Sequence, residues 1–183
     1  MEKTAPAKIA EKPAAKEEFK IISPHNKKSR PVKEKDFERV KEAYYPLRAL
    51  MAGLEEKKIF SSVYAVAHSQ VTKKDPLRFF VINSTSPSLT SESWELPDDL
   101  IINPEIINHV RHTSEKKEGC ITFIGYPDAT VERWHKIVVR FQTLDHEGGK
   151  LISHEKACSG KLAELFQHEI DHFDAKYIWQ GLI

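Results

Sequence analysis

Two histidines four residues apart, His168 and His172, with Glu169 between them, constrain this chain more than any other feature. On a helix, residues four apart lie one turn above each other, so both imidazoles can reach a single metal ion. The glutamate between them then points toward a water molecule beside that ion. The motif alone predicts a helix with a metal site of the kind that metal-assisted hydrolysis requires. Two solvated histidines on a polar helix face remain the alternative interpretation.

The remaining pattern predicts a helix, then several strands, then the helix that carries this motif. From Asp36 to Lys58, apolar residues recur every three or four positions, as in an amphipathic helix, and Pro46 predicts a kink or a break there. The last helix is expected from about Gly160 to about Tyr177, with Ser159 as its cap.

Short apolar runs between turn-forming segments predict the strands, and the last two of these are expected to form a hairpin through Gly148 and Gly149. The expected strands are 63–67, 77–82, 100–110, 121–125 and 136–144. This order indicates an α+β fold in which antiparallel strands pack around a C-terminal metal-binding helix that carries the H-E-x-x-H motif.

Charge divides the chain into a tail and a body. Residues 1–35 contain ten Lys or Arg and five Glu, whereas residues 36–183 carry a net charge of −4 within a total of +1. The tail offers little to bury, so we expect it to be flexible, either simply solvated or in weak contact with an RNA surface. The near-zero total argues against a chain whose main task is to neutralise phosphates.

Two cysteines cannot form a disulfide framework, and no apolar run is long enough for a secretory signal or a membrane span. The acidic residues of the tail also disfavour an organellar transit peptide. We therefore expect a cytoplasmic protein that does not enter a membrane.

A hydrolytic metal site needs a third protein ligand and one open position. Cys120 is a candidate, because a thiolate binds divalent metals well and Gly119 lets the backbone approach closely before the following segment. The alternative is that Cys120 is a small buried apolar residue, and this is the interpretation that we expect for Cys158.

Two separate motifs together resemble those of one known family. Glu-Gly-Cys-Ile-Thr at 118–122 and Gln-His-Glu-Ile-Asp-His-Phe-Asp at 167–174 are similar to the E-G-C-L-S and Q-H-E-x-D-H-L-x-G motifs of peptide deformylases. Members of this family remove the formyl group from the N-terminal methionine of new polypeptides. The segments 102–106, 131–133 and 136–149 match as well, so the resemblance covers about residues 37 to 179.

The first motif of the family, G-x-G-[apolar]-A-A-x-Q, is the part from which this chain departs. The aligned residues are 63–70, where Ala67 and Gln70 match but Val63 and Ala65 replace the two glycines. We expect a narrower or reshaped pocket there. His68, also in this motif, is expected either to contact substrate or to point outward from its strand.

The resemblance implies a role for each matching residue. Cys120, His168 and His172 would hold one divalent ion per chain, typically Fe²⁺ and replaceable by Zn²⁺ or Ni²⁺. Glu169 would take a proton from the attacking water and pass it to the departing amine. The formyl oxygen would be met by the side-chain amide of Gln70 and the backbone N–H of Ile121.

The resemblance also implies substrate contacts and supporting residues. An N-formylated nascent peptide would lie as an added strand against the backbone of Tyr64, Ala65 and Gly119. For the residues that orient the metal-bound imidazoles, Glu118 and Asp171 are candidates, and we favour Glu118 paired with Arg133.

Helical spacing places Lys161 and Leu165 on the same face as the two histidines. In the family an apolar residue occupies the position of Lys161 and helps to form the methionine pocket. Here the lysine is expected to extend out of the pocket toward Glu164, or alternatively to change which side chain is accepted.

Three functions are compatible with these residues. The first is an active, monomeric deformylase of divergent type, with a transient ribosome contact through its basic tail. The second is a deformylase-like binding protein that keeps the metal site but has weak or altered turnover, which the lost glycines favour. The third, a peptidase of the H-E-x-x-H type, is disfavoured because cysteine is an unusual ligand there.

Overall fold

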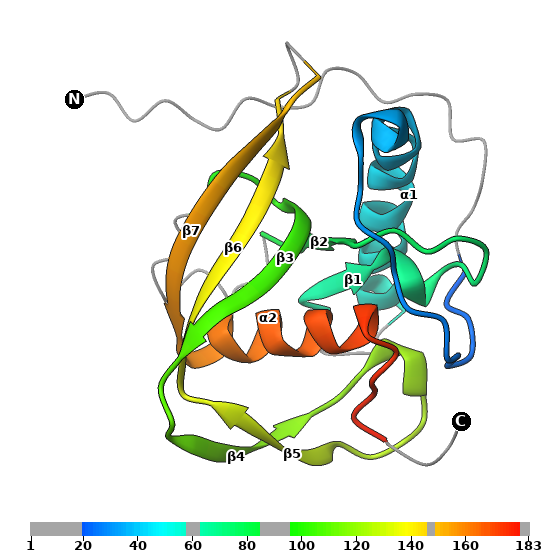
Figure 1. The fold of residues 1–183 in the computed structure, drawn as a ribbon. Coiled ribbons are helices and arrows are strands. Elements are labelled where there is room, and N and C mark those ends of the chain that lie inside the picture. Colours follow the sequence, from blue (N-terminus) through cyan, green and yellow to red (C-terminus); the bar gives the residue numbers. More distant parts are fainter. Residues whose placement is uncertain (1–19, 58–62, 85–95, 146–148, 180–183) are drawn as a thin grey trace.

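The computed structural model describes residues 20–57, 63–84, 96–145 and 149–179 of the chain. A helix near the N-terminus, α1 (Phe37–Glu56), precedes the strands, and a second helix, α2 (Gly160–Phe173), follows them. The strands between the two helices pair in antiparallel fashion, and α2 crosses the sheet (Figure 1). The expected α+β fold class is therefore confirmed.

Five strands form the main sheet, in the spatial order β1-β2-β3-β6-β7. Their bounds are β1 (Ala65–Ala67), β2 (Phe79–Ile82), β3 (Leu100–His109), β6 (Lys136–Leu144) and β7 (Leu151–Ser159). Among the described residues, β1 pairs with β2 only and so lies at one edge of this sheet.

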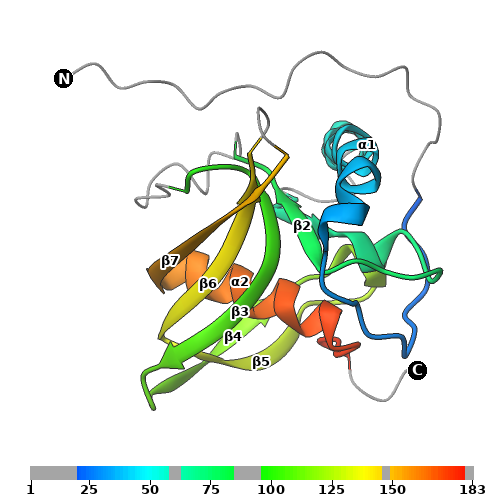
Figure 2. The same ribbon diagram turned by 45° about the horizontal axis from the view of Figure 1, so that its top comes forward.

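Both faces of the sheet are covered, and this explains why β2 is apolar throughout. Successive side chains of a strand point to opposite faces. Accordingly, Phe79 and Val81 belong to the core beneath α1, whereas Phe80 and Ile82 belong to the core beneath α2. The two views in Figures 1 and 2 show the helices on opposite sides of the sheet. The helix that carries the metal motif is therefore packed against the sheet over much of its length.

A smaller sheet adjoins α2 and leads into the cysteine motif. It pairs β4 (Thr113–Glu118) with β5 (Ala129–Trp134), two strands that the apolar runs did not reveal because they alternate with charged residues. The strand expected at 121–125 is wrong. A short 3-10 helix, η3 (Ile121–Phe123), follows Cys120 instead, and its residues Ile121 and Phe123 are buried.

The two helices differ from their expected form in detail. α1 continues as one helix across Pro46, so the expected break is absent. α2 ends at Phe173 rather than near Tyr177. Ser159 directly precedes α2 as expected, but its side chain makes no capping hydrogen bond.

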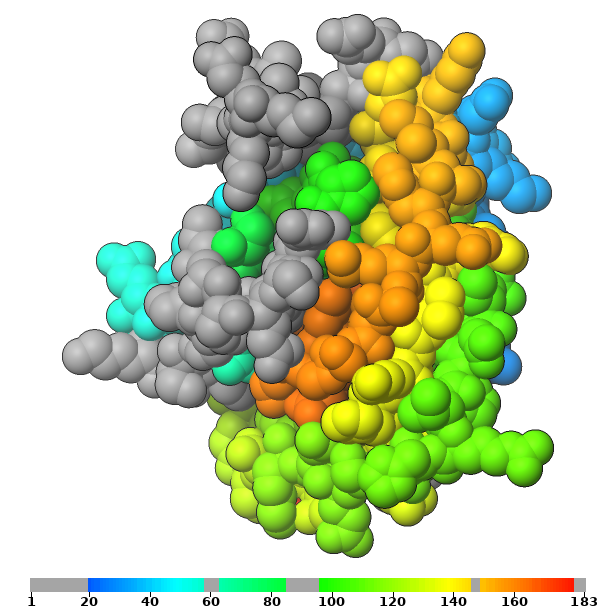
Figure 3. Space-filling model, turned by 90° about the vertical axis from the view of Figure 1, so that its left-hand side faces the viewer, coloured from blue at the N-terminus to red at the C-terminus, as the bar shows by residue number. Residues whose placement is uncertain are grey.

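The expected hairpin partner is wrong: the hairpin at Gly149 joins β6 to β7, and the two strands pair from Lys136 opposite Ser159 to Leu144 opposite Leu151. Gly148 lies outside the described residues. Gly149 has φ of +64°, a conformation that glycine adopts without steric cost, and its N–H donates to the carbonyl of Asp145. β7 was missed because one of its faces is exposed and polar. Figure 3 shows β6 and β7, in yellow and orange, along the outside of the molecule.

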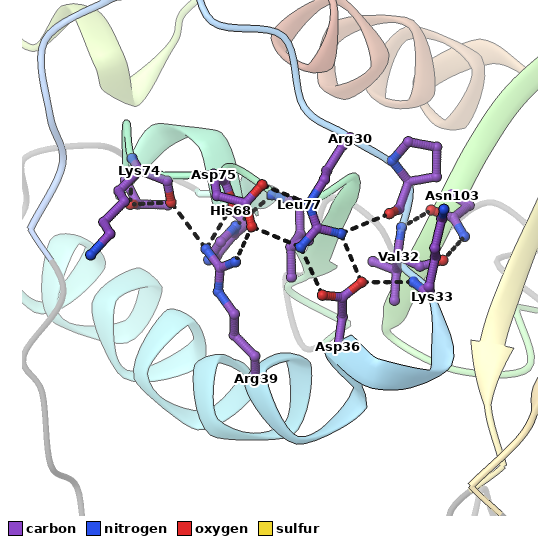
Figure 4. Close-up of polar contacts among 12 residues, drawn as sticks. Arg30, Val32, Lys33, Asp36, Arg39, His68, Lys74, Asp75, Leu77 and Asn103 are labelled. Carbon is purple, nitrogen blue, oxygen red and sulfur yellow. Dashed lines mark hydrogen bonds and ion pairs between the residues drawn. The ribbon is translucent and has the colours of Figure 1, made fainter.

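Residues 20–35 lie against the body, so the expected boundary of the flexible tail at residue 35 is wrong. Arg30 forms a β-bridge with Leu77, and Val32 is buried and exchanges backbone hydrogen bonds with the side chain of Asn103. The Arg30 guanidinium also pairs with Asp36 and Asp75 (Figure 4). These contacts stabilise a segment whose composition alone resembles that of a tail. Residues 1–19 lie outside the described part of the chain, and for them the tail stays a prediction.

Candidate metal centre and active site

α2 brings the two histidines of the opening motif together. The rings of His168 and His172 lie with their centroids 4.8 Å apart and nearly perpendicular to each other. α2 keeps a helical conformation here because its apolar residues, among them Phe166, Ile170 and Phe173, pack into the core beneath the sheet. The position of α2 against the sheet is therefore fixed, and the two imidazoles face the same point.

Cys120 reaches the same place from the other side of the pocket. It follows β4 directly after Gly119, and its Sγ lies 3.3 Å from Nε2 of His172. One ligand atom each from Cys120, His168 and His172 lies within 4.8 Å of the others. A Cβ added to Gly119 would approach Oδ1 of Asp128 to 2.9 Å, so a larger residue there would require the Asp128 side chain to move.

The donor set of this cluster fits a divalent transition metal. A thiolate and two imidazoles leave a fourth tetrahedral position open, as catalytic sites require. Burial by itself would raise the pKa of the Cys120 thiol, but the charge of His172 and hydrogen bonds from both histidines bring that pKa well below its ordinary value of 9. The cysteine is thus poised as a thiolate, the form that binds a metal.

Glu169 lies beside the cluster and is only 3% exposed. Its Oε2 has no hydrogen-bond partner among the described residues. Burial raises the pKa of this carboxyl group above its ordinary value, because the charged form loses its hydration. A buried carboxylate with a free oxygen and a raised pKa is suited to accept a proton and to give it back.

Glu118 orients one of the two imidazoles. Its Oε2 lies 2.8 Å from Nδ1 of His168, and Arg133 donates two hydrogen bonds to the same carboxylate, each of 2.8 Å. Burial would raise the pKa of Glu118, but the hydrogen bonds from Arg133 and His168 lower it to about 2. Arg133 also pairs with Asp171 at 2.6 Å. The predicted pairing of Glu118 with Arg133 is present. Each partner also contacts the metal motif, Glu118 at His168 and Arg133 at Asp171.

A pocket of about 280 Å³ opens beside these groups. It combines apolar walls with the reactive groups of Cys120, His168 and Glu169. The other predicted site residues that line it are Gln70, Ile121, Tyr64, Ala65, Gly119, Lys161, Leu165 and Glu118. Val63, which stands where a glycine was expected by resemblance, lines the pocket too, together with Glu164 and Asp128.

Gln70 is held by contacts at both ends of its side-chain amide. Its Oε1 accepts a hydrogen bond from the backbone N–H of Ala67 at 2.8 Å, so the Nε2 group must point the other way. Nε2 donates to the hydroxyl of Thr122 at 2.9 Å and lies 3.6 Å from Sγ of Cys120. The amide N–H₂ is thus presented beside the metal ligands.

Lys161 forms an ion pair at the wall of the pocket. Its Nζ lies 3.0 Å from Oε2 of Glu164 and 5.8 Å from the centre of the Tyr64 ring. Oε1 of Glu164 pairs in turn with Lys116 at 2.9 Å. This geometry agrees with a lysine that extends along the wall toward Glu164.

His68 has neither of the two roles that the sequence suggested. It belongs to a 3-10 helix, η2 (His68–Gln70), and is 3% exposed. Its ring stacks on Phe79, and its Nδ1 accepts a hydrogen bond from the N–H of Leu77 at 2.9 Å (Figure 4). Burial lowers the pKa of His68 to about 3, so it stays neutral and shapes the turn that carries Gln70.

Sequence reasoning missed two residues near the site, His25 and Tyr177. Both are buried, and the ring centroids of Tyr177 and His172 lie 5.3 Å apart. His25 belongs to a segment whose composition predicted a tail, and Tyr177 lies beyond the end of α2. Neither residue is part of a recognisable motif, and only the apolar run Tyr-Ile-Trp at 177–179, beyond the metal motif, could have drawn attention to Tyr177.

Comparison with known proteins gives consistent matches. A family model described as polypeptide deformylase matches residues 23–182. The peptide deformylase of Bifidobacterium adolescentis is 40% identical over 93 residues, which cover 50% of this chain and 40% of that protein. That of Mesorhizobium japonicum is 35% identical over 100 residues, covering 55% of this chain and 51% of the relative. The matched segments thus span about half or less of these relatives.

Solved structures match a longer part of this chain than the sequence relatives do. The peptide deformylase of Legionella pneumophila is 27% identical with a TM-score of 0.60, covering 87% of this chain and 83% of that one. The peptide deformylase of Thermotoga maritima gives a TM-score of 0.64 at 24% identity, over 88% of this chain and 95% of that one. The second likeness shows that the two chains share a fold.

Proposed function

The chain belongs to the polypeptide deformylase family, and from that premise we propose that it is a metal-dependent hydrolase that removes the N-formyl group from the N-terminal methionine of nascent polypeptides. One observation carries the proposal. Ligand atoms of Cys120, His168 and His172 lie within 4.8 Å of one another at a pocket that also exposes the buried carboxyl group of Glu169. Three ligands and an adjacent base are the parts that metal-assisted hydrolysis of an amide needs.

Cys120, His168 and His172 would hold one divalent ion per chain. We propose Fe²⁺ as the native ion, with Zn²⁺ or Ni²⁺ as substitutes, since thiolate and imidazole donors suit all three. When bound, the ion polarises the formyl carbonyl group and lowers the pKa of a water molecule. The hydrogen bond from His168 to Glu118 fixes which nitrogen of that ring faces the ion.

Glu169 moves the proton in this reaction. Its free Oε2 accepts a proton from the attacking water, and the raised pKa of the carboxyl group lets it hold that proton until the amine departs. The proton then passes to the nitrogen of the leaving peptide. Loss of the proton donor would block turnover, because the amine is a poor leaving group without a proton. Loss of the proton acceptor would block it as well, because the attacking water must give up a proton.

Gln70 and the backbone N–H of Ile121 would donate hydrogen bonds to the formyl oxygen as its negative charge develops. The side-chain amide of Gln70 is already oriented by Ala67 and Thr122, so little reorganisation is required. Loss of one such donor typically costs about 3 kcal/mol of transition-state stabilisation.

The substrate peptide would add to the edge of the main sheet. β1 pairs with β2 only among the described residues, and Tyr64 and Ala65 of this edge line the pocket opposite Gly119. An extended peptide there would place its formyl group toward Cys120 and its first side chain between Leu165 and Lys161.

The remaining features of the proposal concern the whole protein. No helix in the described part of the chain is long and apolar enough to cross a membrane. We propose a cytoplasmic monomer whose basic tail contacts the ribosome transiently. The alternative, a binding protein with weak turnover, is not favoured, because the ligands, Gln70 and Glu169 all lie together despite the lost glycines.

Formate release tests this function. The full chain is loaded anaerobically with Fe²⁺ or Ni²⁺ and assayed with formyl-Met-Ala-Ser, and we expect turnover by both forms. Glu169→Gln should bind one ion per chain and yet lose activity by at least about a hundredfold. Absence of formate from wild-type protein that carries one ion per chain would overturn the proposal.

A further inference from the structure

The segment between residues 22 and 29, which we name the strap, crosses behind the pocket and contacts two parts of the site. The N–H of Ile22 donates to the carbonyl of Gln70 at 2.9 Å. At the other end, the N–H of Ser29 donates to the carbonyl of Phe173 at 2.8 Å, which satisfies one of the free carbonyls at the end of α2. The strap thus joins the Gln70 turn to the helix of the metal motif.

His25 lies in the middle of the strap and makes its most specific contact. Its Nε2 lies 2.9 Å from the carbonyl oxygen of Ser69, and its Nδ1 accepts the N–H of Lys27 at 3.2 Å. A carbonyl oxygen can only accept and a backbone N–H can only donate, so Nε2 carries the hydrogen. The side chain is buried, with 7% of the residue exposed.

The backbone of His25 contacts the other half of the site. The hydroxyl of Tyr177 accepts from the N–H of His25 and donates to its carbonyl, both at 3.3 Å. The Tyr177 ring packs against that of His172, whose Nδ1 has no hydrogen-bond partner among the described residues. His168 has Glu118 to orient it, whereas His172 depends on packing against rings such as that of Tyr177.

All three residues of η2 are therefore held by contacts with residues of other segments. His68 is fixed by Leu77 and Phe79, and the carbonyls of Ser69 and Gln70 are fixed by the strap. Of these supports, the strap also donates a hydrogen bond to the last residue of the metal-bearing helix, through the N–H of Ser29. The strap therefore helps to keep Gln70 beside the candidate metal ligands, together with the hydrogen bonds of the Gln70 side chain to Ala67 and Thr122.

We propose that His25 is a positioning residue, which holds the side-chain amide of Gln70 at its place beside the metal ligands through the carbonyl of Ser69. The catalytic consequence rests on the proposed function, but the positioning itself does not. A displacement of about 1 Å in a reacting group can reduce a rate by about a hundredfold, so a loosened Gln70 should lower kcat. Substrate binding along β1 does not involve His25, so KM should change little.

The backbone N–H of Ala67 provides a readout that needs no turnover. It donates to Oε1 of Gln70, so its hydrogen exchange reports how well the Gln70 side chain is held. In His25→Ala, NMR should show faster exchange at Ala67, whereas Val139 in the middle of the sheet should be unchanged. His25→Gln keeps an N–H donor that can reach the carbonyl of Ser69, and it should restore slow exchange.

Kinetics of the same variants test the catalytic consequence. For His25→Ala we expect kcat to fall by about tenfold or more, KM to stay within about twofold, and bound metal to stay at one ion per chain. His25→Gln should recover most of kcat. The matched control is His154→Ala, which removes a partly buried histidine that bonds to Thr143 far from the strap, and it should change neither exchange nor kcat.

The two proposals fail in different ways. Unchanged exchange at Ala67 and unchanged kcat in His25→Ala would overturn the role of His25. Equal effects of His25→Ala and His25→Gln would do the same, because they would indicate a loss of packing rather than of the hydrogen bond. If the wild-type chain releases no formate, the proposed function fails, and exchange at Ala67 still decides the role of His25.

Discussion

At the scale of single residues, the site depends on groups whose neighbours change their chemistry. Glu169 and Glu118 are both buried carboxyl groups beside the candidate metal ligands: Glu169 follows His168 in α2, and Glu118 ends β4 two residues before Cys120. Glu118 has Arg133 and His168 as partners, and its pKa is lowered to about 2, whereas Glu169 has a free oxygen and a raised pKa. The first is therefore fixed as an anion that orients a ligand, and the second can exchange a proton.

The two cysteines should respond differently to substitution. Cys120→Ala removes one of three ligands, so we expect loss of tightly bound metal and of activity. Cys158 packs in the core beneath α2 without contact to the cluster, and Cys158→Ala should keep one ion per chain and lower stability by about 1 kcal/mol. Metal content after dialysis and urea unfolding measure these effects. Loss of metal from Cys158→Ala would contradict the ligand assignment.

Lys161 should not determine which first side chain is accepted. Its ammonium group is paired with Glu164 along the wall of the pocket, so we expect wild-type protein to prefer formyl-Met over formyl-Glu peptides. Lys161→Met should change kcat/KM for formyl-Met-Ala-Ser by less than about threefold, because the apolar wall is retained. A preference for formyl-Glu that disappears in Lys161→Met would show instead that the lysine selects acidic side chains.

At the scale of elements, the described N-terminal segment and the start of α1 are joined by a charged cluster (Figure 4). Arg30 pairs with Asp36 at 2.7 Å and with Asp75 at 2.6 Å, and Asp75 also pairs with Arg39 of α1. Asp75 adopts a left-handed conformation with φ of +53°, which this set of partners helps to hold. The cluster fixes the strap at its C-terminal end.

Asp36 makes this cluster sensitive to acid. The hydrogen bonds from Arg30 lower its pKa from 3.8 to about 2, so its contribution to stability is present above pH 4 and is lost as the pH falls toward 2. Asp36→Asn should reduce the free energy of unfolding by about 1 to 2 kcal/mol at pH 7, with a smaller difference from wild type below pH 4.

Urea unfolding at pH 7, 4 and 2.5 measures this difference. Glu38→Gln is the matched control, because the Glu38 carboxylate is 82% exposed and pairs only with Lys41 in the described structure. A difference between wild type and Asp36→Asn that is the same at all three pH values would exclude the titration of Asp36 as its cause.

At the scale of the whole molecule, the segment from residue 20 to residue 35 belongs with the body, because Arg30 and Val32 contact it. Removal of residues 1–19 should leave the melting temperature and kcat unchanged, because the composition of this segment offers little to bury and predicts a tail. Removal of residues 1–32 also deletes the strap and Val32, and the melting temperature should fall by at least about 6 °C. Calorimetry of the two shortened chains distinguishes these expectations. Equal melting temperatures would mean that the strap does not stabilise the body.

The sequence predicted those features that depend on residues close together along the chain. His168, Glu169 and His172 were placed together because helical geometry is local. The apolar runs predicted β2, β3 and β6, because β2 and the first residues of β3 are buried throughout and β6 alternates buried apolar residues with more exposed ones. Strands with an exposed face, such as β7, alternate with charged residues and gave no such signal. The segment at 121–125 was apolar enough for a strand but packs as a short 3-10 helix.

The sequence by itself determined which groups the proposed chemistry would use: a helix with two histidines and a glutamate, a cysteine motif that would complete the ligand set, and a family likeness that joins them. Tertiary structure alone decided which of the two imidazoles Glu118 contacts, that His68 is buried, and that residues 22–29 join the Gln70 turn to α2. The physical reason is distance along the chain. Periodicity and motif spacing report contacts within a few residues, whereas His25 and Tyr177 are 152 residues apart and meet only when the domain has folded.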